Sequence, residues 1–109
     1  MNLSSVDFNV DGDLIVKSDS KLSSCTVDSS GTISSYGDLN SSSCTWNNAN
    51  LSFVGRTPQT VSGSTVTVSD LVIDNDSKSG ITFESKVNYN TLDSGSSVIN
   101  GASNLVENA

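Results

Sequence analysis

The sequence contains no histidine, one proline, three alanines and only five basic residues. Without histidine it lacks the usual general base of serine or cysteine catalysis and the commonest zinc ligand. Its two cysteines cannot alone supply the four ligands of a structural zinc site. We therefore expect the many serines not to act as nucleophiles, and we predict a protein that is not an enzyme and holds no cofactor.

Positive charge and long apolar runs are also scarce. Twelve acidic residues give a net charge of -7, and this surface would repel a phosphate backbone, because nucleic-acid binding depends on clustered basic side chains. The five basic residues are scattered: Lys17, Lys21, Arg56, Lys78 and Lys86. No apolar run approaches the roughly 18 residues of a membrane span, and residues 1–10 do not resemble a signal peptide. We expect neither nucleic acid binding nor membrane insertion.

Small polar residues dominate what is present, with 24 Ser, 12 Asn and 9 Thr. Ser and Asn side chains compete with helical hydrogen bonds, whereas Thr fits a pleated sheet, so helix is disfavoured. Leu, Ile, Val and Phe make up 28 of the 109 residues, which is enough for one domain, 1–109, with a thin core. Residues 1–5 and 96–109 contain no charged helix that could cap the fold, and we expect them to be flexible or strand-donating.

Short apolar runs of three to five residues recur along the chain, each bounded by Gly, Asn, Asp or Ser. This pattern is typical of many short β-strands and predicts an all-β fold. The expected strands lie at 6–10, 14–16, 32–34, 51–54, 65–68, 71–73, 81–83 and 86–89.

Several of these segments return after about 20 residues. The similar segments are Ser-Ser-Cys-Thr at 23–26 and 42–45, Asn50-Leu51-Ser52 and Asp70-Leu71-Val72 followed by Leu92, and Gly-Asp-Leu at 12–14 and 37–39. Such a spacing predicts a parallel β-solenoid of about five coils, stacked at about 4.8 Å into an elongated rod. Its expected core is Leu14, Leu39, Leu51, Phe53, Leu71, Ile73, Ile81 and Phe83. Short strands in about 100 residues also fit an antiparallel β-sandwich.

The repeated Ser-Ser-Cys-Thr segment places Cys25 and Cys44 at equivalent positions of neighbouring coils. They could form a disulfide, which would close a loop of about 20 residues, stabilise the fold by about 3 kcal/mol and imply an oxidising compartment. Alternatively, they are two buried free thiols in a ladder.

Three weak binding motifs also appear. Asp7, Asn9 and Asp11 match the first half of a calcium loop, but its twelfth position is a serine instead of a carboxylate. Asp74 and Asp76 lie on one side of an extended backbone, where they could bind calcium or act on a polysaccharide. The simpler interpretation of these residues is a solvated strand face and a solvated corner. Trp46 is either a sugar-stacking platform or a core residue.

Residues 50–85 resemble the degenerate repeats of bacterial surface β-helix proteins, the filamentous-haemagglutinin-like and autotransporter-passenger adhesins. The segments that carry the resemblance are Gln-Thr-Val-Ser-Gly at 59–63, Asp-Leu-Val-Ile-Asp-Asn at 70–75 and Gly-Ile-Thr at 80–82. The resemblance implies a right-handed parallel β-helix that is secreted or surface-anchored and serves as a stalk, adhesin or matrix fibre. Those proteins are much longer than this chain.

The expected function is therefore a non-enzymatic structural or adhesive module of a bacterial cell surface or extracellular matrix. A short solenoid leaves an unpaired strand at each end, and such edges recruit other chains, so we expect head-to-tail or strand-donating self-association. Carbohydrate is a further possible partner. The alternative is a β-sandwich recognition domain that binds carbohydrate or calcium near Trp46 and Asp74.

Overall fold

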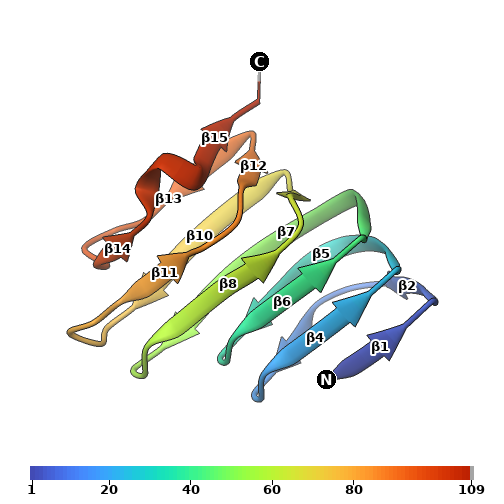
Figure 1. The fold of residues 1–109 in the computed structure, drawn as a ribbon, viewed down its shortest axis with the longest axis horizontal. Coiled ribbons are helices and arrows are strands. Elements are labelled where there is room, and N and C mark those ends of the chain that lie inside the picture. The colour runs from blue at the N-terminus through green and yellow to red at the C-terminus, as the bar shows by residue number, and fades with distance from the viewer. Residues whose placement is uncertain (109) are drawn as a thin grey trace.

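The structure, a computed structural model, describes residues 1–108 and all their side chains except that of Asn48. The chain winds as a parallel β-solenoid of about six turns, with three sheets along its sides (Figure 1). Sheet A contains β1 (Asn2–Ser4), β4 (Ser20–Ser23), β6 (Leu39–Ser42), β8 (Gln59–Gly63), β11 (Ile81–Phe83) and β14 (Ile99–Asn100). Sheet B contains β2 (Asp7–Val10), β3 (Leu14–Val16), β5 (Thr26–Ser35), β7 (Thr45–Gly55), β10 (Asp70–Asn75) and β13 (Thr91–Asp93). Sheet C contains β9 (Val66–Thr67), β12 (Val87–Tyr89) and β15 (Leu105–Glu107), and a 3-10 turn, η1 (Ala102–Asn104), precedes β15.

Every pairing between the described strands is parallel, which confirms the predicted solenoid and excludes the antiparallel sandwich. The six strands of sheet A give one turn more than the five that we predicted. The handedness implied by the resemblance stays a prediction.

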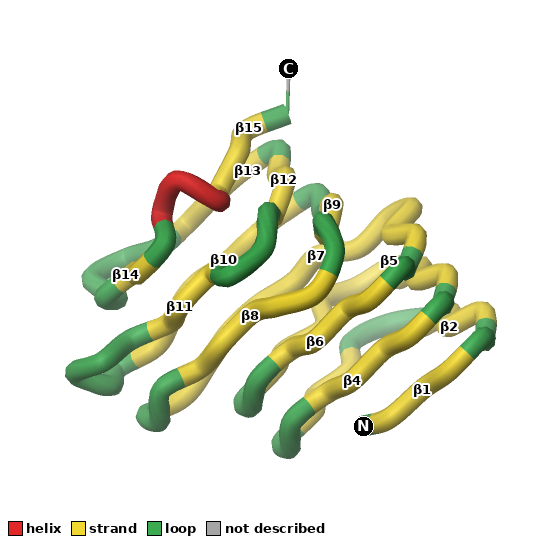
Figure 2. Tube along the Cα trace, viewed as in Figure 1, coloured by secondary structure: helices red, strands yellow, loops and turns green. Residues whose placement is uncertain are grey.

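The register confirms most of the predicted stacks. Leu51 pairs with Leu71, and Leu71 pairs with Leu92, along sheet B. The two Ser-Ser-Cys-Thr segments also stack, since Ser23 pairs with Ser42 and Thr26 with Thr45. Figure 2 shows the successive coils lying side by side in chain order.

The Gly-Asp-Leu repeat was misinterpreted. Leu14 lies in sheet B, where it pairs with Ile33, whereas Leu39 lies in sheet A between Ser20 and Val61. The two copies are 25 residues apart, which exceeds the length of any coil, so they fall on different sides of the solenoid.

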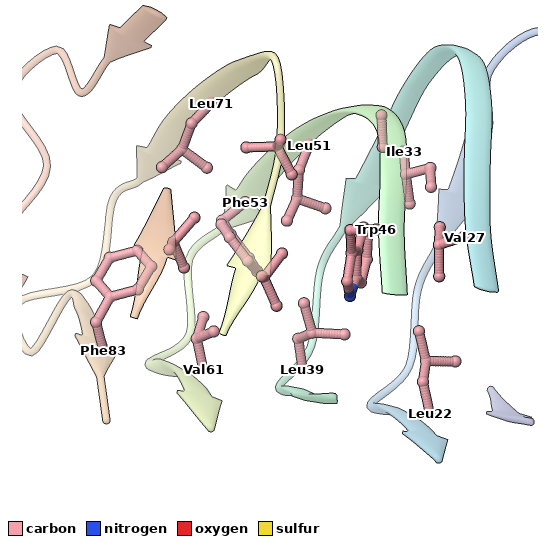
Figure 3. Packing of buried hydrophobic residues seen from close by; sticks show 14 of the residues in the cluster. Leu22, Val27, Ile33, Leu39, Trp46, Leu51, Phe53, Val61, Leu71 and Phe83 are labelled. Carbon is pink, nitrogen blue, oxygen red and sulfur yellow. The ribbon is translucent and has the colours of Figure 1, made fainter. Parts of the chain in front are cut away.

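The core lies between the sheets as a single column of apolar side chains (Figure 3). Seven of the eight predicted core residues are buried: Leu39, Leu51, Phe53, Leu71, Ile73, Ile81 and Phe83. The rings of Phe53 and Phe83 meet edge to face, with centroids 6.0 Å apart. Leu14 is only partly buried, because it belongs to the first turn and has a neighbouring coil on one side only.

The shape of one chain differs from the predicted rod. The principal extents are 35, 32 and 24 Å and the radius of gyration is 12.5 Å, close to the roughly 13 Å of a compact domain of this length. One chain is therefore not elongated. The two ends contain short strands, since β1 pairs with β4, β14 with β11 and β15 with β12; Ala109 lies outside the described residues. That residues 1–5 and 96–109 are flexible or strand-donating stays a prediction.

Serine occupies a left-handed backbone conformation at one corner of three successive coils. Ser5, Ser24 and Ser43 have φ values of 56°, 54° and 55°, and each directly follows a strand of sheet A. This conformation costs an ordinary residue roughly 1–2 kcal/mol and is most strained for a β-branched side chain. The repeated serine pair at 4–5, 23–24 and 42–43 therefore marks a turn as well as a strand end.

We expect Ser24→Val to lower the free energy of unfolding by about 2 kcal/mol, because valine is strained at positive φ, whereas Ser24→Gly stays within about 1 kcal/mol of the parent. Ser23→Val is the matched control, since Ser23 lies in strand β4, where a β-branched residue is favoured. Urea unfolding followed by tryptophan fluorescence measures all three variants. An equal loss in Ser23→Val and Ser24→Val would contradict the explanation.

Candidate functional site

Trp46 is buried in the core, with 8% of its surface exposed, and is not available as a sugar-stacking platform (Figure 3). Its indole N–H donates a hydrogen bond of 2.9 Å to Ser41 Oγ. This bond satisfies the one polar group of the ring, so the indole serves as a core aromatic.

The half calcium loop does not gather its carboxylates around one point. Asp7 and Asn9 lie on the exposed side of β2, whereas the Asp11 carboxylate accepts a 3.2 Å hydrogen bond from the hydroxyl of Ser30 in the next coil. Asp7 and Asn9 line a small hollow of about 150 Å³ with Phe8, Thr26 and Asp28. Within residues 1–108 no three acidic or cysteine side chains are grouped to hold a metal ion.

Asp74 and Asp76 are exposed on either side of Asn75, at the end of β10. The residue between them is the more important one structurally, because Asn75 is buried, with 2% of its surface exposed. Its side-chain amide donates to Thr57 O at 2.8 Å and to Gln59 Oε1 at 2.9 Å, while its oxygen accepts from Ser77. The carboxylates of Asp74 and Asp76 therefore lie beside a corner at which the Asn75 side chain bonds to other residues of the chain.

Gln59 extends this buried polar corner into the coil before. Its side-chain amide donates to Ser35 O at 2.8 Å and to Gly37 O at 3.0 Å. Together, Gln59 and Asn75 bind the backbone of three successive turns at the place where the chain passes from sheet B to sheet A. Our sequence analysis missed this pair, because polar residues were assigned to the surface.

We expect Gln59→Leu to destabilise the protein by about 3 kcal/mol, because it removes three hydrogen bonds of a buried side chain, those to Ser35 O, Gly37 O and the Asn75 amide. Thr67→Leu is the control, since Thr67 is an exposed strand residue, and it should change the free energy of unfolding by less than about 0.5 kcal/mol. Urea denaturation measures both. A well-folded Gln59→Leu protein with the parent's midpoint would show that these bonds add nothing.

Both cysteines are free thiols stacked on neighbouring coils. The backbone N–H of Cys25 donates to the Cys44 sulfur at 3.3 Å, and each thiol donates to a serine carbonyl two residues before it. Equivalent side chains of adjacent parallel strands point the same way about 4.8 Å apart, whereas a disulfide brings its Cβ atoms to about 3.8 Å. The observed ladder therefore favours thiols over a disulfide.

We expect a thiol reagent to modify Cys44 before Cys25 in the folded protein, because Cys44 is half-buried and Cys25 is 2% exposed. In denaturant without reductant, both thiols should react. Mass spectrometry of timed samples identifies the modified residue. Recovery of no reactive thiol after denaturation would reveal a disulfide instead.

Aspartate side chains link the coils on the outside. Asp13 Oδ1 accepts from the backbone N–H of Thr32 at 2.9 Å, Asp19 Oδ1 from that of Asp38 at 2.8 Å, and Asp38 Oδ1 from that of Thr60 at 2.9 Å. Each carboxylate thus meets a backbone donor one turn further along the chain. The acidic residues at the corners have a role in stacking that their exposed positions alone do not reveal.

A second hollow, larger than the one beside Asp7, lies on the outer side of sheet A and has a volume of about 460 Å³. It crosses β1, β4, β6 and β8, which lie next to one another in Figure 2. Its lining consists of Met1, Asn2, Asp19, Ser20, Lys21, Asp38, Asn40, Thr60 and Ser62. Because this sheet-A groove lies within the size range of ligand sites, it is the best candidate for a binding site.

No protein family, curated protein sequence or solved structure matches the chain. Among the described residues no helix has the length and apolar character needed to span a membrane. Of what the resemblance to adhesin repeats implied, the structure confirms the parallel β-solenoid fold, and no family or relative identifies the chain as an adhesin.

Proposed function

We propose that the protein is a non-enzymatic structural module of a bacterial surface or extracellular matrix, and that its coils extend into a longer assembly by end-to-end contact between copies. The observation that carries this proposal is the state of the two terminal turns. Each has a partner coil on one side only, and each exposes apolar side chains.

Exposed large apolar side chains are concentrated at these two ends. Of the five in the described chain, only Tyr36 belongs to an inner turn. Those of the terminal turns are Val6, Ile15, Val98 and Val106. Inward-facing residues of the same turns are also incompletely covered, namely Leu3, Phe8 and Leu14 at one end and Leu92, Ile99 and Leu105 at the other. A further coil stacked on either end would cover them.

The backbone of β1, the strand of sheet A at the N-terminal end, can also pair with another copy of the chain. On either side of β1, the backbone oxygen of Met1 accepts from Lys21 N at 2.8 Å, and Ser5 N donates to Ser23 O at 2.9 Å. In a parallel ladder alternate residues bond to opposite neighbours. The backbone groups of Asn2 and Ser4 therefore face away from the stack, where the edge of another solenoid can pair with them.

The role as a structural module is supported by composition and fold together. An acidic, Ser- and Asn-rich chain with net charge -7 and no histidine offers little for catalysis, while a parallel solenoid pairs its inner backbone from turn to turn and provides a stiff scaffold. Adhesion is the part of this proposal that requires a ligand site in addition to the scaffold.

Sedimentation of the purified chain over a range of concentrations tests the assembly. The average mass should rise with concentration and also with salt, because both ends carry acidic residues, Asp7, Asp11 and Asp13 at one and Asp93 and Glu107 at the other, whose repulsion salt screens.

Ile15→Asp and Val106→Asp should each abolish the rise in mass, since they place charge on the two ends, whereas Tyr36→Asp, away from the ends, should behave as the parent. These positions are exposed, so the fold is expected to survive. A parent chain that remains monomeric at high concentration and high salt would overturn the proposed assembly.

A further inference from the structure

The sheet-A groove has an ordered lining that the scaffold role does not use. Its central part is built from three pairs of side chains on successive coils, at or just before the starts of β4, β6 and β8. The members of each pair are two residues apart, so they lie on the same side of the extended chain. The pairs are Asp19 with Lys21, Asp38 with Asn40, and Thr60 with Ser62. The register stacks Lys21 beside Asn40 and Asn40 beside Ser62.

The two carboxylates in the groove are held in place by the backbone. The Oδ1 atoms of Asp19 and Asp38 each accept an N–H from the following coil, at 2.8 and 2.9 Å. Within the described part of the chain, neither Oδ2 atom has a hydrogen-bond partner. The Oδ2 atoms of Asp19 and Asp38 are therefore two acceptors in the groove, one coil apart. Because the backbone already holds both side chains, a ligand would not lose entropy in ordering them.

Hydrogen-bond donors occupy the neighbouring row. The Lys21 ammonium forms no ion pair with any described residue, and the Asn40 amide donates to Ser62 Oγ at 3.0 Å, which fixes the orientation of both side chains. Donors and acceptors thus alternate across the groove and repeat along the solenoid axis about every 4.8 Å.

This lining selects among ligand classes. The carboxylates of Asp19 and Asp38 balance the ammonium groups of Lys21 and of the Met1 N-terminus, so the lining offers no net positive charge to phosphate or to an acidic sugar. The lining also contains no aromatic ring on which a nucleobase could stack. Hydroxyl groups, in contrast, both donate and accept, and a chain of sugars presents them at regular intervals. A volume of about 460 Å³ is sufficient for a short oligosaccharide.

We propose that the sheet-A groove binds an uncharged oligosaccharide that lies along the solenoid axis across β4, β6 and β8. Its hydroxyls donate to the Oδ2 atoms of Asp19 and Asp38 and accept from Lys21. This site would supply the adhesive part of the module, but it does not depend on end-to-end assembly, because its three central coils are inner ones.

The test is titration of the ¹⁵N-labelled protein with cellotetraose, mannotetraose and N,N′,N″,N‴-tetraacetylchitotetraose, followed by NMR. At least one of these uncharged tetrasaccharides should shift the amide signals of Lys21, Asn40 and Ser62, with a dissociation constant of about 1 mM or below. Tetragalacturonate, which carries four carboxylates, should bind at least about tenfold more weakly.

The variant Asp19→Asn with Asp38→Asn removes the free acceptors but keeps an amide oxygen for each backbone N–H, so the fold should be retained. It should weaken binding at least about tenfold, as expected for loss of hydrogen bonds to charged groups. The control, Asp74→Asn with Asp93→Asn, makes the same change of charge outside the groove and should bind as the parent.

Three outcomes would overturn the proposal: no uncharged tetrasaccharide binds at about 10 mM, the groove and control variants bind equally well, or tetragalacturonate binds best. None of them bears on the sedimentation of the parent chain, so the groove and the assembly can fail separately.

Discussion

The structure depends on the parallel pairing of each coil with the next. This pairing places residues 18 to 22 positions apart directly above one another, so the side chains of one vertical row must suit one another in size and polarity. Leucines follow leucines along sheet B, and small polar residues follow one another on the outside of sheet A. A thin core is enough because every inner apolar side chain is covered from two sides.

The sequence was sufficient to predict the fold because residues that stack on one another resemble each other, and similar segments therefore recur about every 20 residues along the chain. Repeats that differ from this spacing by a few residues were misleading, as the Gly-Asp-Leu pair shows, since a shift of about five residues moves a segment to another side of the coil. The number of turns was underestimated because the last strands, β14 and β15, have only two or three residues each and weak apolar patterns.

The candidate site was far less predictable than the fold. Trp46 and the acidic pairs were singled out by residue type, but burial and local hydrogen bonds decide their roles. The groove is formed by rows of residues 19 to 22 positions apart, one from each coil, and no motif along the chain marks them. Only the register, known to the residue, would have revealed that Asp19, Asp38 and Thr60 form such a row.

The corner serines at positions 5, 24 and 43 suggest how this chain reaches its native form. Nearly all its contacts join residues about one coil apart, so a nascent chain gains little until a whole turn has been synthesised. Each completed turn then provides the strands on which the next turn pairs. The left-handed serine at the corner turns the chain so that the following strand lies on the preceding turn. Growth of this kind is sequential, and a chain that fails at one corner would lose all the turns that come after it.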